Sequence, residues 1–181
     1  MPQFGGSTVI TPGIRLILLD CFETLVELEG GAYRPRHGMR EFLIHFSTRA
    51  AVPVAVVSDA EQSQVEGAIR TAGLGDYLVA VYHAGNAAES LGGGRTRKRL
   101  DKPVTDFSLR PEQAVFIGDS PLDAEAAKHY QVHFIRVPRS EDRNFSFASL
   151  ITGPSRYRSQ EFNQIFIDRY SKDHKPDGPR P

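Results

Sequence analysis

The sequence predicts an α/β fold, a doubly wound and mainly parallel sheet with helices on both faces. Short, nearly continuous apolar runs alternate along the chain with segments whose apolar residues recur at helical spacing. Three of these runs lead directly into a polar residue, namely Asp20, Ser58 or Asp119. Continuous apolar runs suit strands that are buried on both faces of a parallel sheet. Their alternation with helices indicates right-handed crossovers within one sheet.

We expect five strands, all short and apolar. The first reads IRLILLD at residues 14–20 and is nearly continuous in its apolar side chains. The other four lie at residues 53–57, 77–82, 114–117 and 132–137. A length of five or six residues is usual for strands in globular proteins.

Three helices are expected between these strands, at residues 37–50, 61–72 and 120–130. Apolar residues recur in them at three- and four-residue spacing, which makes one apolar face on each helix. Gly73 is a suitable C-terminal stop for the second helix, because glycine adopts the left-handed conformation at low cost. Acidic residues near the start of the third helix suit the helix dipole.

The domain organisation follows from this pattern. We expect an N-terminal extension at residues 1–13, one catalytic domain at 14–150 and a polar C-terminal extension at 151–181. Within that extension, residues 161–170 suit a short helix, after which the chain should fray. Residues 91–102 contain three consecutive glycines and several basic side chains, and we expect a flexible basic loop there.

Composition excludes several classes of protein. The chain has 22 Lys and Arg and 22 Asp and Glu residues, so no overall charge draws it to nucleic acid or to an anionic membrane. Its one cysteine permits no intramolecular disulfide, which fits a reducing cytosol. Residues 1–13 lack the pattern of a signal peptide, and no apolar run approaches the roughly 20 residues that span a bilayer. We therefore expect a soluble, cytoplasmic protein without a membrane partner.

The three polar residues that follow strands are the first functional signal. Ligands of doubly wound sheets bind at the carboxyl ends of the strands. Asp20, Ser58 and Asp119 each stand at such an end, so we expect their side chains to converge on one crevice. Each of them has a structural alternative, because Asp and Ser after a strand often cap a helix or a turn.

Four segments resemble the ordered motifs of the haloacid dehalogenase-like hydrolases. They are residues 20–24 (DCFET), Ser58, the pair Lys102 and Pro103, and residues 118–123 (GDSPLD). The resemblance spans about residues 14–138. It implies a Rossmann-like fold, and the short intervals between the motifs imply that no large cap domain covers the site.

The resemblance also implies a chemistry. Asp20 would attack a phosphoryl group and form an aspartyl-phosphate, which divides one difficult step into two. Mg²⁺ would be held by the carboxylates of Asp20 and Asp119 and by the backbone carbonyl of Phe22, with Asp123 in support. The Ser58 hydroxyl and the backbone N–H of Asp59 would hold the phosphoryl oxygens.

A lysine is needed to offset the negative charge that grows on the phosphoryl group. The resemblance assigns this role to Lys102, because a Lys-Pro pair at this distance before the fourth motif matches the family pattern. Lys98 and Arg99 are rival candidates.

The sequence departs from the phosphatase pattern at Phe22. Phosphatases of this superfamily carry a second aspartate there as general acid and base, a role worth about 10²–10⁴-fold in rate. Three interpretations remain open: a substrate with a good leaving group, a proton shuttle elsewhere such as Glu23, or a binding and regulatory module with little turnover. An aromatic residue at this position also resembles metal-independent 2-haloacid dehalogenases, although Asp119 and Asp123 favour a cation.

We expect a phosphorylated substrate as the partner of this site. Enzymes without a cap often act on large substrates or close their sites by oligomerising, so a macromolecular substrate and a homo-oligomer both remain open. The basic residues at 95–99 could contact phosphates, but no nucleic-acid-binding motif accompanies them.

Overall fold

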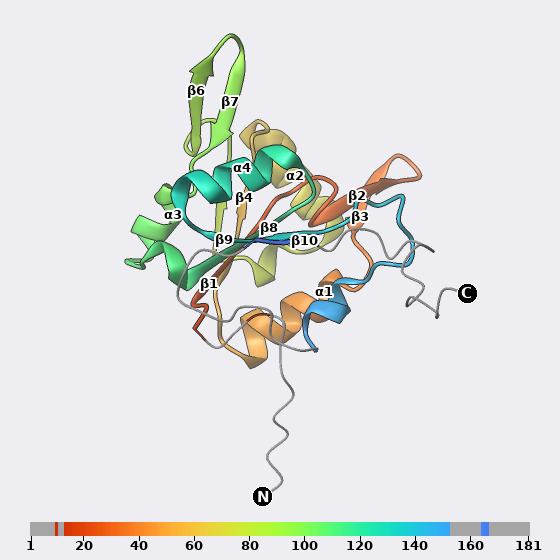
Figure 1. Ribbon diagram of the computed structural model, residues 1–181. Coiled ribbons are helices and arrows are strands. Elements are labelled where there is room, and N and C mark those ends of the chain that lie inside the picture. Colours follow the sequence, from red (N-terminus) through yellow and green to blue (C-terminus); the bar gives the residue numbers. More distant parts are fainter. Residues whose placement is uncertain (1–9, 11–12, 153–163, 167–181) are drawn as a thin grey trace, which may run out of the picture.

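The computed structural model describes residues 10, 13–152 and 164–166. Its centre is a parallel six-stranded sheet with the strand order β10-β9-β8-β1-β4-β5 (Figure 1). The strands are β1 (Leu16–Leu19), β4 (Val54–Val57), β5 (Ala80–Tyr82), β8 (Ala114–Gly118), β9 (His133–Arg136) and β10 (Gln164–Phe166). This arrangement confirms the predicted fold class, and all five predicted strands are present.

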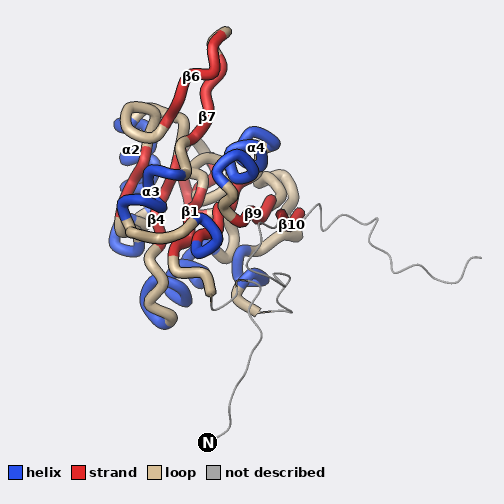
Figure 2. The backbone as a smooth tube through the Cα atoms, turned by 60° about the vertical axis from the view of Figure 1, so that its left-hand side comes forward, coloured by secondary structure: helices blue, strands red, loops and turns tan. Residues whose placement is uncertain are grey.

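Alternate side chains of the central strands enter two separate cores, one on each face of the sheet. In β1, Ile17 and Leu19 face the core that includes helices α1 (Met39–Leu43) and α2 (Gln62–Ala72). Leu16 and Leu18 face the core that includes α3 (Asp101–Asp106) and α4 (Pro121–Tyr130). Figure 2 shows helices on both sides of the strands. Strands β1, β4 and β8 are buried throughout, which explains their continuous apolar runs.

The predicted helices are present, with one difference in geometry. Helix α2 ends where expected, since Gly73 follows it with φ 66°. Helix α4 begins with a capping box between Ser120 and Asp123. The segment predicted as one helix at 37–50 forms the short helix α1 and continues as a π-helix, Ile44–Arg49.

Two antiparallel hairpins extend from the sheet. The first joins β2 (Val26–Glu29) to β3 (Ala32–Pro35). The second joins β6 (Ala88–Gly92) to β7 (Arg95–Lys98) and projects from the body of the molecule (Figures 1 and 2).

The prediction of a flexible basic loop at 91–102 is wrong, because this stretch contains the end of β6, all of β7 and the start of α3. The consecutive glycines form the turn, where all three have positive φ.

The C-terminal prediction is also wrong where the structure describes it. Residues 161–170 were expected to form a short helix, but Gln164–Phe166 is strand β10, paired in parallel with β9. The side-chain amide of Gln164 donates to the backbone carbonyl of Ala124, 2.9 Å away. Pairing with β10 satisfies backbone groups that β9 would otherwise present as a sheet edge. The remainder of the predicted extension lies outside the described residues.

The two intervals between motifs in which a cap domain could be inserted hold small elements. Between Asp20 and Ser58 lie the β2–β3 hairpin, α1 and the π-helix. Between Ser58 and Lys102 lie α2, a 3₁₀ turn, β5, the β6–β7 hairpin and the start of α3. Among the described residues, no helix is both long and apolar enough to span a bilayer.

Candidate active site

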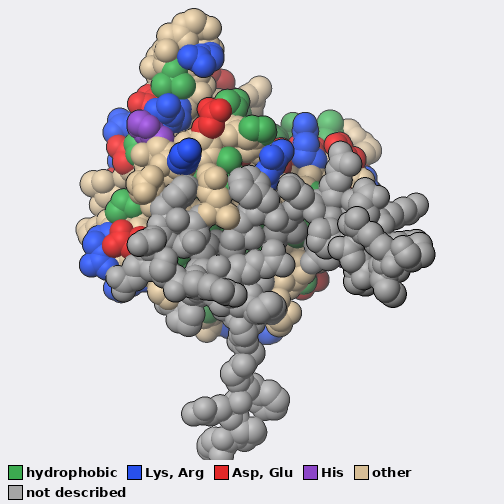
Figure 3. Space-filling model, in the orientation of Figure 1, with side chains coloured by type: hydrophobic (Ala, Val, Ile, Leu, Met, Phe, Trp, Pro, Cys, Tyr) green, Lys and Arg blue, Asp and Glu red, His purple; other side chains and the backbone are tan. Residues whose placement is uncertain are grey.

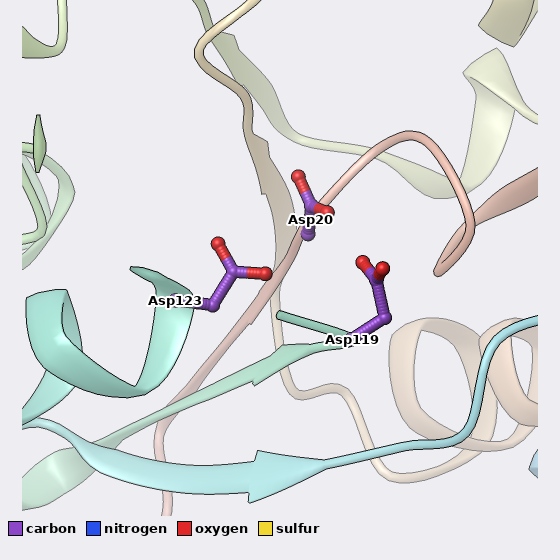
Figure 4. Close-up of side chains that lie close together, drawn as sticks. All are labelled: Asp20, Asp119 and Asp123. Carbon is purple, nitrogen blue, oxygen red and sulfur yellow. The ribbon is translucent and has the colours of Figure 1, made fainter. Parts of the chain in front are cut away.

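Three carboxylates meet at the carboxyl ends of the central strands. Asp20 follows β1, Asp119 follows β8 and Asp123 lies in the first turn of α4 (Figure 4). One oxygen from each side chain lies within 4.8 Å of the others. The predicted meeting of Asp20 and Asp119 at one edge of the sheet is therefore observed, because β1 and β8 are neighbours in the sheet.

Lys98 provides the cation of this cluster. Its Nζ lies 2.7 Å from Oδ1 of Asp20 and 2.6 Å from Oδ1 of Asp123. The side chain is buried, and burial alone lowers the pKa of a lysine. The adjacent carboxylates of Asp20 and Asp123 outweigh that effect and raise the pKa of Lys98. Its ammonium is therefore charged at neutral pH.

Lys102, the lysine expected in the site, lies elsewhere. It belongs to α3, and its Nζ is 2.7 Å from Oδ1 of Asp106 one turn further along the same helix. Its side chain is 41% exposed, against 8% for Lys98. The structure therefore does not bring Lys102 to the carboxylates, and the rival Lys98 lies there instead. The β6–β7 hairpin brings Lys98 back to the sheet. The prediction of a flexible loop at 91–102 did not include this hairpin.

The charge balance of the cluster favours a cation. Burial raises the pKa of Asp20 well above the usual range of an aspartate; Lys98 opposes this and Asp123 adds to it. Lys98 and the exposed Arg139 face three carboxylates, of which Asp20 and Asp123 are buried, so the cluster keeps an excess of negative charge. Carboxylate oxygens are the ligands that hard divalent cations prefer. The donor set therefore fits a magnesium ion, which would lower the cost of keeping Asp20 ionised.

Asp119 is held from two sides. The hydroxyl of the buried Thr24 donates to its Oδ1 at 3.1 Å, and Nε of Arg139 lies 3.6 Å from its Oδ2. Thr24 reaches Asp119 because the chain folds back after β1, where the N–H of Leu25 donates to the carbonyl of Cys21. The turn that follows the first motif therefore orients a carboxylate of the fourth.

The carboxylate of Asp123 contacts both Ser120 and Lys98. Its Oδ2 accepts from the backbone N–H of Ser120, while its Oδ1 contacts Lys98. Gly118 makes this approach possible, since a Cβ there would lie 2.4 Å from Oδ2 of Asp123. A side chain at residue 118 would therefore displace Asp123.

Ser58 follows β4 as expected, and it is buried. Its Oγ accepts from the backbone N–H of Ala60 at 3.2 Å, so the hydroxyl proton is left to donate elsewhere. The alternative of a simple helix cap does not apply, because Glu61 is the N-cap of α2. Asp59 is exposed and lines one cavity together with Lys98 and Asp123.

Comparison with protein families decides the classification. Residues 23–137, more than half of the chain, match the family described as haloacid dehalogenase-like hydrolases. The chain belongs to this family. The matched region begins three residues after Asp20 and includes Ser58, Lys98, Asp119 and Asp123. A search of curated proteins found no match.

Solved haloacid dehalogenase-like structures share the fold. A predicted phosphoglycolate phosphatase from Haemophilus somnus has a TM-score of 0.60 at 13% identity, covering 78% of this chain and 98% of that one. CbbY from Rhodobacter sphaeroides, in complex with xylulose-1,5-bisphosphate, has a TM-score of 0.59 at 16% identity, covering 75% and 91%. A hydrolase of this superfamily from Geobacter sulfurreducens has a TM-score of 0.55 at 16% identity, covering 70% and 93%.

Phe22 is the point at which this haloacid dehalogenase-like chain departs from the phosphatase pattern. The phenylalanine is partly buried, and its ring packs against Tyr33 of β3 with 5.2 Å between the ring centroids. An aromatic pair of this kind stabilises the turn against the β2–β3 hairpin but offers no proton.

The neighbouring Glu23 is held as an anion. Its Oε2 accepts from the backbone N–H of Ser140 at 2.9 Å, and Nε of Arg139 lies 3.9 Å away. Burial by itself raises the pKa of Glu23, but these contacts lower the pKa below its usual value. Arg36 also donates to the backbone carbonyl of Glu23. Glu23 therefore links the turn after β1 to the loop after β9.

Proposed function

We propose that the protein is a Mg²⁺-dependent phosphohydrolase or phosphotransferase that works through an aspartyl-phosphate on Asp20. The observation that carries the proposal is the contact of Lys98 with both Asp20 and Asp123, at the edge of the sheet where Asp119 also lies. Asp20, Asp119 and the backbone carbonyl of Phe22 would hold the magnesium ion. When bound, the ion would neutralise charge on the phosphoryl oxygens.

In the first step, a carboxylate oxygen of Asp20 forms a bond to phosphorus and the bond from phosphorus to the leaving group breaks. The Ser58 hydroxyl and the Asp59 backbone N–H hold phosphoryl oxygens, and the ammonium of Lys98 offsets their charge. Donors fixed in place before the reaction stabilise the transition state without a reorganisation cost. Asp123 acts through Lys98, which it positions.

Phe22 restricts the leaving group. An alkoxide requires a proton as it departs, and no acid stands at residue 22 to supply it. Glu23 is a poor substitute, because the Ser140 N–H and Arg139 hold its carboxylate ionised. The substrate would therefore be an acyl phosphate, a phosphoanhydride or another ester whose leaving group departs as an anion.

The same absence of an acid–base group at residue 22 affects the second step. Attack of water on the aspartyl-phosphate also gains from a general base, so hydrolysis of this intermediate should be slow. A slow second step lets the phosphoenzyme accumulate and favours transfer to acceptors that are better nucleophiles than water. Phosphotransferase activity is proposed on this ground.

The structural relatives support a phosphatase-type reaction. One of them is named as a phosphoglycolate phosphatase and another holds a sugar bisphosphate. A phosphorylated substrate for this chain is proposed by that analogy. The cytoplasm as its location, a homo-oligomeric state and a macromolecular substrate remain predictions from the sequence.

A binding or regulatory module is the second candidate, and the packing of Phe22 against Tyr33 favours it. In that case the site would hold a cation and a phosphoryl group without useful turnover. Metal-independent dehalogenation receives no such support, because the three clustered carboxylates suit a cation. Halide release from 2-chloropropionate in the presence of a chelator would instead support dehalogenation.

The proposal is tested with 4-nitrophenyl phosphate and acetyl phosphate, each assayed with and without Mg²⁺. We expect Asp20→Asn to abolish turnover, because an amide is a poor nucleophile and a poor metal ligand. Asp76→Asn is the matched control, since Asp76 is exposed and remote from the cluster, and it should retain wild-type rates. Full activity of Asp20→Asn would refute the mechanism.

A further inference from the structure

A cleft opens between the β6–β7 hairpin and the N-terminal half of α4. Its volume is about 330 Å³, and its inner end is lined by Lys98 and Asp123, the residues that contact each other at the carboxylate cluster. Leu91 and Arg95 of the hairpin line its outer part, with Leu122 of α4 among the residues facing them. Pockets for small molecules usually measure about 300–1,000 Å³. The cleft therefore has the size of a small-molecule site, and Lys98 in its lining contacts Asp20.

The hairpin wall of this cleft is fixed against α4. The phenol of Tyr130, the last residue of α4, donates to Oε1 of Glu89 in β6 at 2.6 Å. Arg97 of β7 contacts the same oxygen at 3.3 Å, and Lys98 reaches Asp123 at the other end of the helix. These contacts hold the hairpin at both ends of α4, so the cleft between the two elements has a defined width.

The charges of the cleft leave one cation available. Arg97 is paired with Glu89, and Lys98 is paired with two aspartates. Arg95 is exposed, and within the described part of the chain its side chain has neither an ion pair nor a hydrogen bond. In Figure 3, Lys and Arg side chains and hydrophobic side chains lie together on the projecting hairpin. A ligand with an anionic end would therefore find a free guanidinium here.

The cleft also has an apolar part that is accessible to solvent. Leu122 is 61% exposed although it lies beside the catalytic cluster, between Pro121 and Asp123. Leu91 lies across the cleft on the hairpin. A flat apolar body placed between these two leucines would remove their side chains from water, which is favourable in proportion to the apolar area covered.

We infer that this cleft binds the leaving group of a small phosphorylated substrate and that Arg95 binds a second anionic group on it. The inference rests on the proposed function, because it places the phosphoryl group at Asp20. The substrate class is an organic phosphate with an apolar body and a carboxylate or second phosphate at its far end. A guanidinium binds either anion through two parallel hydrogen bonds.

Glu125 on the α4 wall gives the opposite expectation. Its carboxylate lines the same cleft and would attract a substrate with a cationic far end. Near the N-terminal end of α4, however, the helix dipole already favours a negative charge. No comparable effect offsets the positive charge of Arg95, so we expect the far end of the substrate to be anionic. Variants of the two residues separate these cases.

The test uses two substrates that differ in one charge, 4-carboxyphenyl phosphate and its neutral counterpart 4-carbamoylphenyl phosphate. We expect the wild-type protein with Mg²⁺ to prefer the carboxylate in kcat/KM by about tenfold, which corresponds to one charge-assisted contact. Arg95→Gln should reduce this preference to near unity. Arg99→Gln is the matched control, because Arg99 pairs with Asp101 outside the cleft, and it should keep the preference.

A binding measurement separates this inference from the proposed function. The non-hydrolysable 4-carboxybenzyl phosphonate is titrated calorimetrically into the wild-type protein and each variant in the presence of Mg²⁺. Weaker binding by Arg95→Gln, by about tenfold, supports the cleft even if no phosphate ester is turned over. The inference is overturned if Arg95→Gln leaves both the preference and the binding unchanged, or if Glu125→Gln alone alters them.

Discussion

The ammonium of Lys98 lies 2.7 Å from a carboxylate oxygen of Asp20 and 2.6 Å from one of Asp123. Lys98 thereby joins the end of β1, strand β7 of the projecting hairpin and the first turn of α4. Together with the contact of Tyr130 with Glu89, this contact fixes where the hairpin wall of the cleft lies. Structure and proposed catalysis both depend on it.

Replacing Lys98 tests that dependence. Lys98→Met leaves two buried carboxylates without their cation, and breaking a buried pair in this way typically costs about 3–5 kcal/mol. We expect a correspondingly lower free energy of unfolding in urea and loss of turnover. Lys102→Met, which removes an exposed pair on α3, should remain close to wild type in both. Equal effects of the two substitutions would show that Lys98 has no special role.

Gly118→Ala tests the close approach of Asp123 to the end of β8. The added Cβ would lie 2.4 Å from a carboxylate oxygen, so Asp123 must move away and Lys98 loses a partner. We expect a loss of about 1–3 kcal/mol in the free energy of unfolding. Gly67→Ala in α2 is the control: beyond its chain neighbours and the backbone of its own helix, no described atom lies within 4 Å of the added Cβ, and the free energy of unfolding should rise by about 0.5–1 kcal/mol. The two substitutions should therefore move the urea midpoint in opposite directions.

Phe22→Asp tests whether the missing acid limits the reaction. In the wild-type protein, kcat/KM should fall steeply as the pKa of the leaving group rises across a series of aryl and alkyl phosphates. Phe22→Asp should flatten this dependence and raise the rate for alkyl phosphates by about 10²-fold. Phe22→Leu, which also removes the contact with Tyr33, controls for lost packing. A uniform loss of activity in Phe22→Asp would instead mean that Phe22 belongs to a working site.

His133 gives the protein a predictable response to acid. Burial lowers the pKa of this histidine in the folded state, although nearby Glu112 opposes the effect. As the pH falls below the unfolded value of about 6.5, the unfolded chain takes up a proton that the folded chain resists. Stability should therefore decrease as the pH is lowered from 7 through 6. In His133→Gln, the free energy of unfolding measured with a chemical denaturant should depend less on pH over this range. An unchanged pH dependence would exclude His133 as its source.

The sheet and its acidic residues were predictable from the sequence because they depend on local signals. Strands buried on both faces require continuous apolar runs, and parallel strands place Asp20 and Asp119 at one edge wherever the strands are neighbours. Asp123 was also predictable, since a capping box fixes it in the first turn of α4.

Lys98 was not predictable to the same degree, because the strand that carries it depends on distant contacts. Residues 95–98 are polar and have little preference for strand, and the hairpin is held by Glu89 against Tyr130, 41 residues further along the chain. The short strand β10 has the same origin, as it forms only beside β9. The Lys-Pro pair was a misleading signal, since Lys102 pairs within its own helix.

Direct detection of the phosphoenzyme tests the central claim best. The protein is mixed with acetyl phosphate and Mg²⁺, quenched in acid and analysed by peptide mass spectrometry. We predict a single added phosphoryl group on Asp20, removed by hydroxylamine and absent in Asp20→Asn, because an acyl phosphate forms only where the nucleophile is a carboxylate. A phosphoryl group on another residue, or one that persists in Asp20→Asn, would contradict the assignment of Asp20 as the nucleophile.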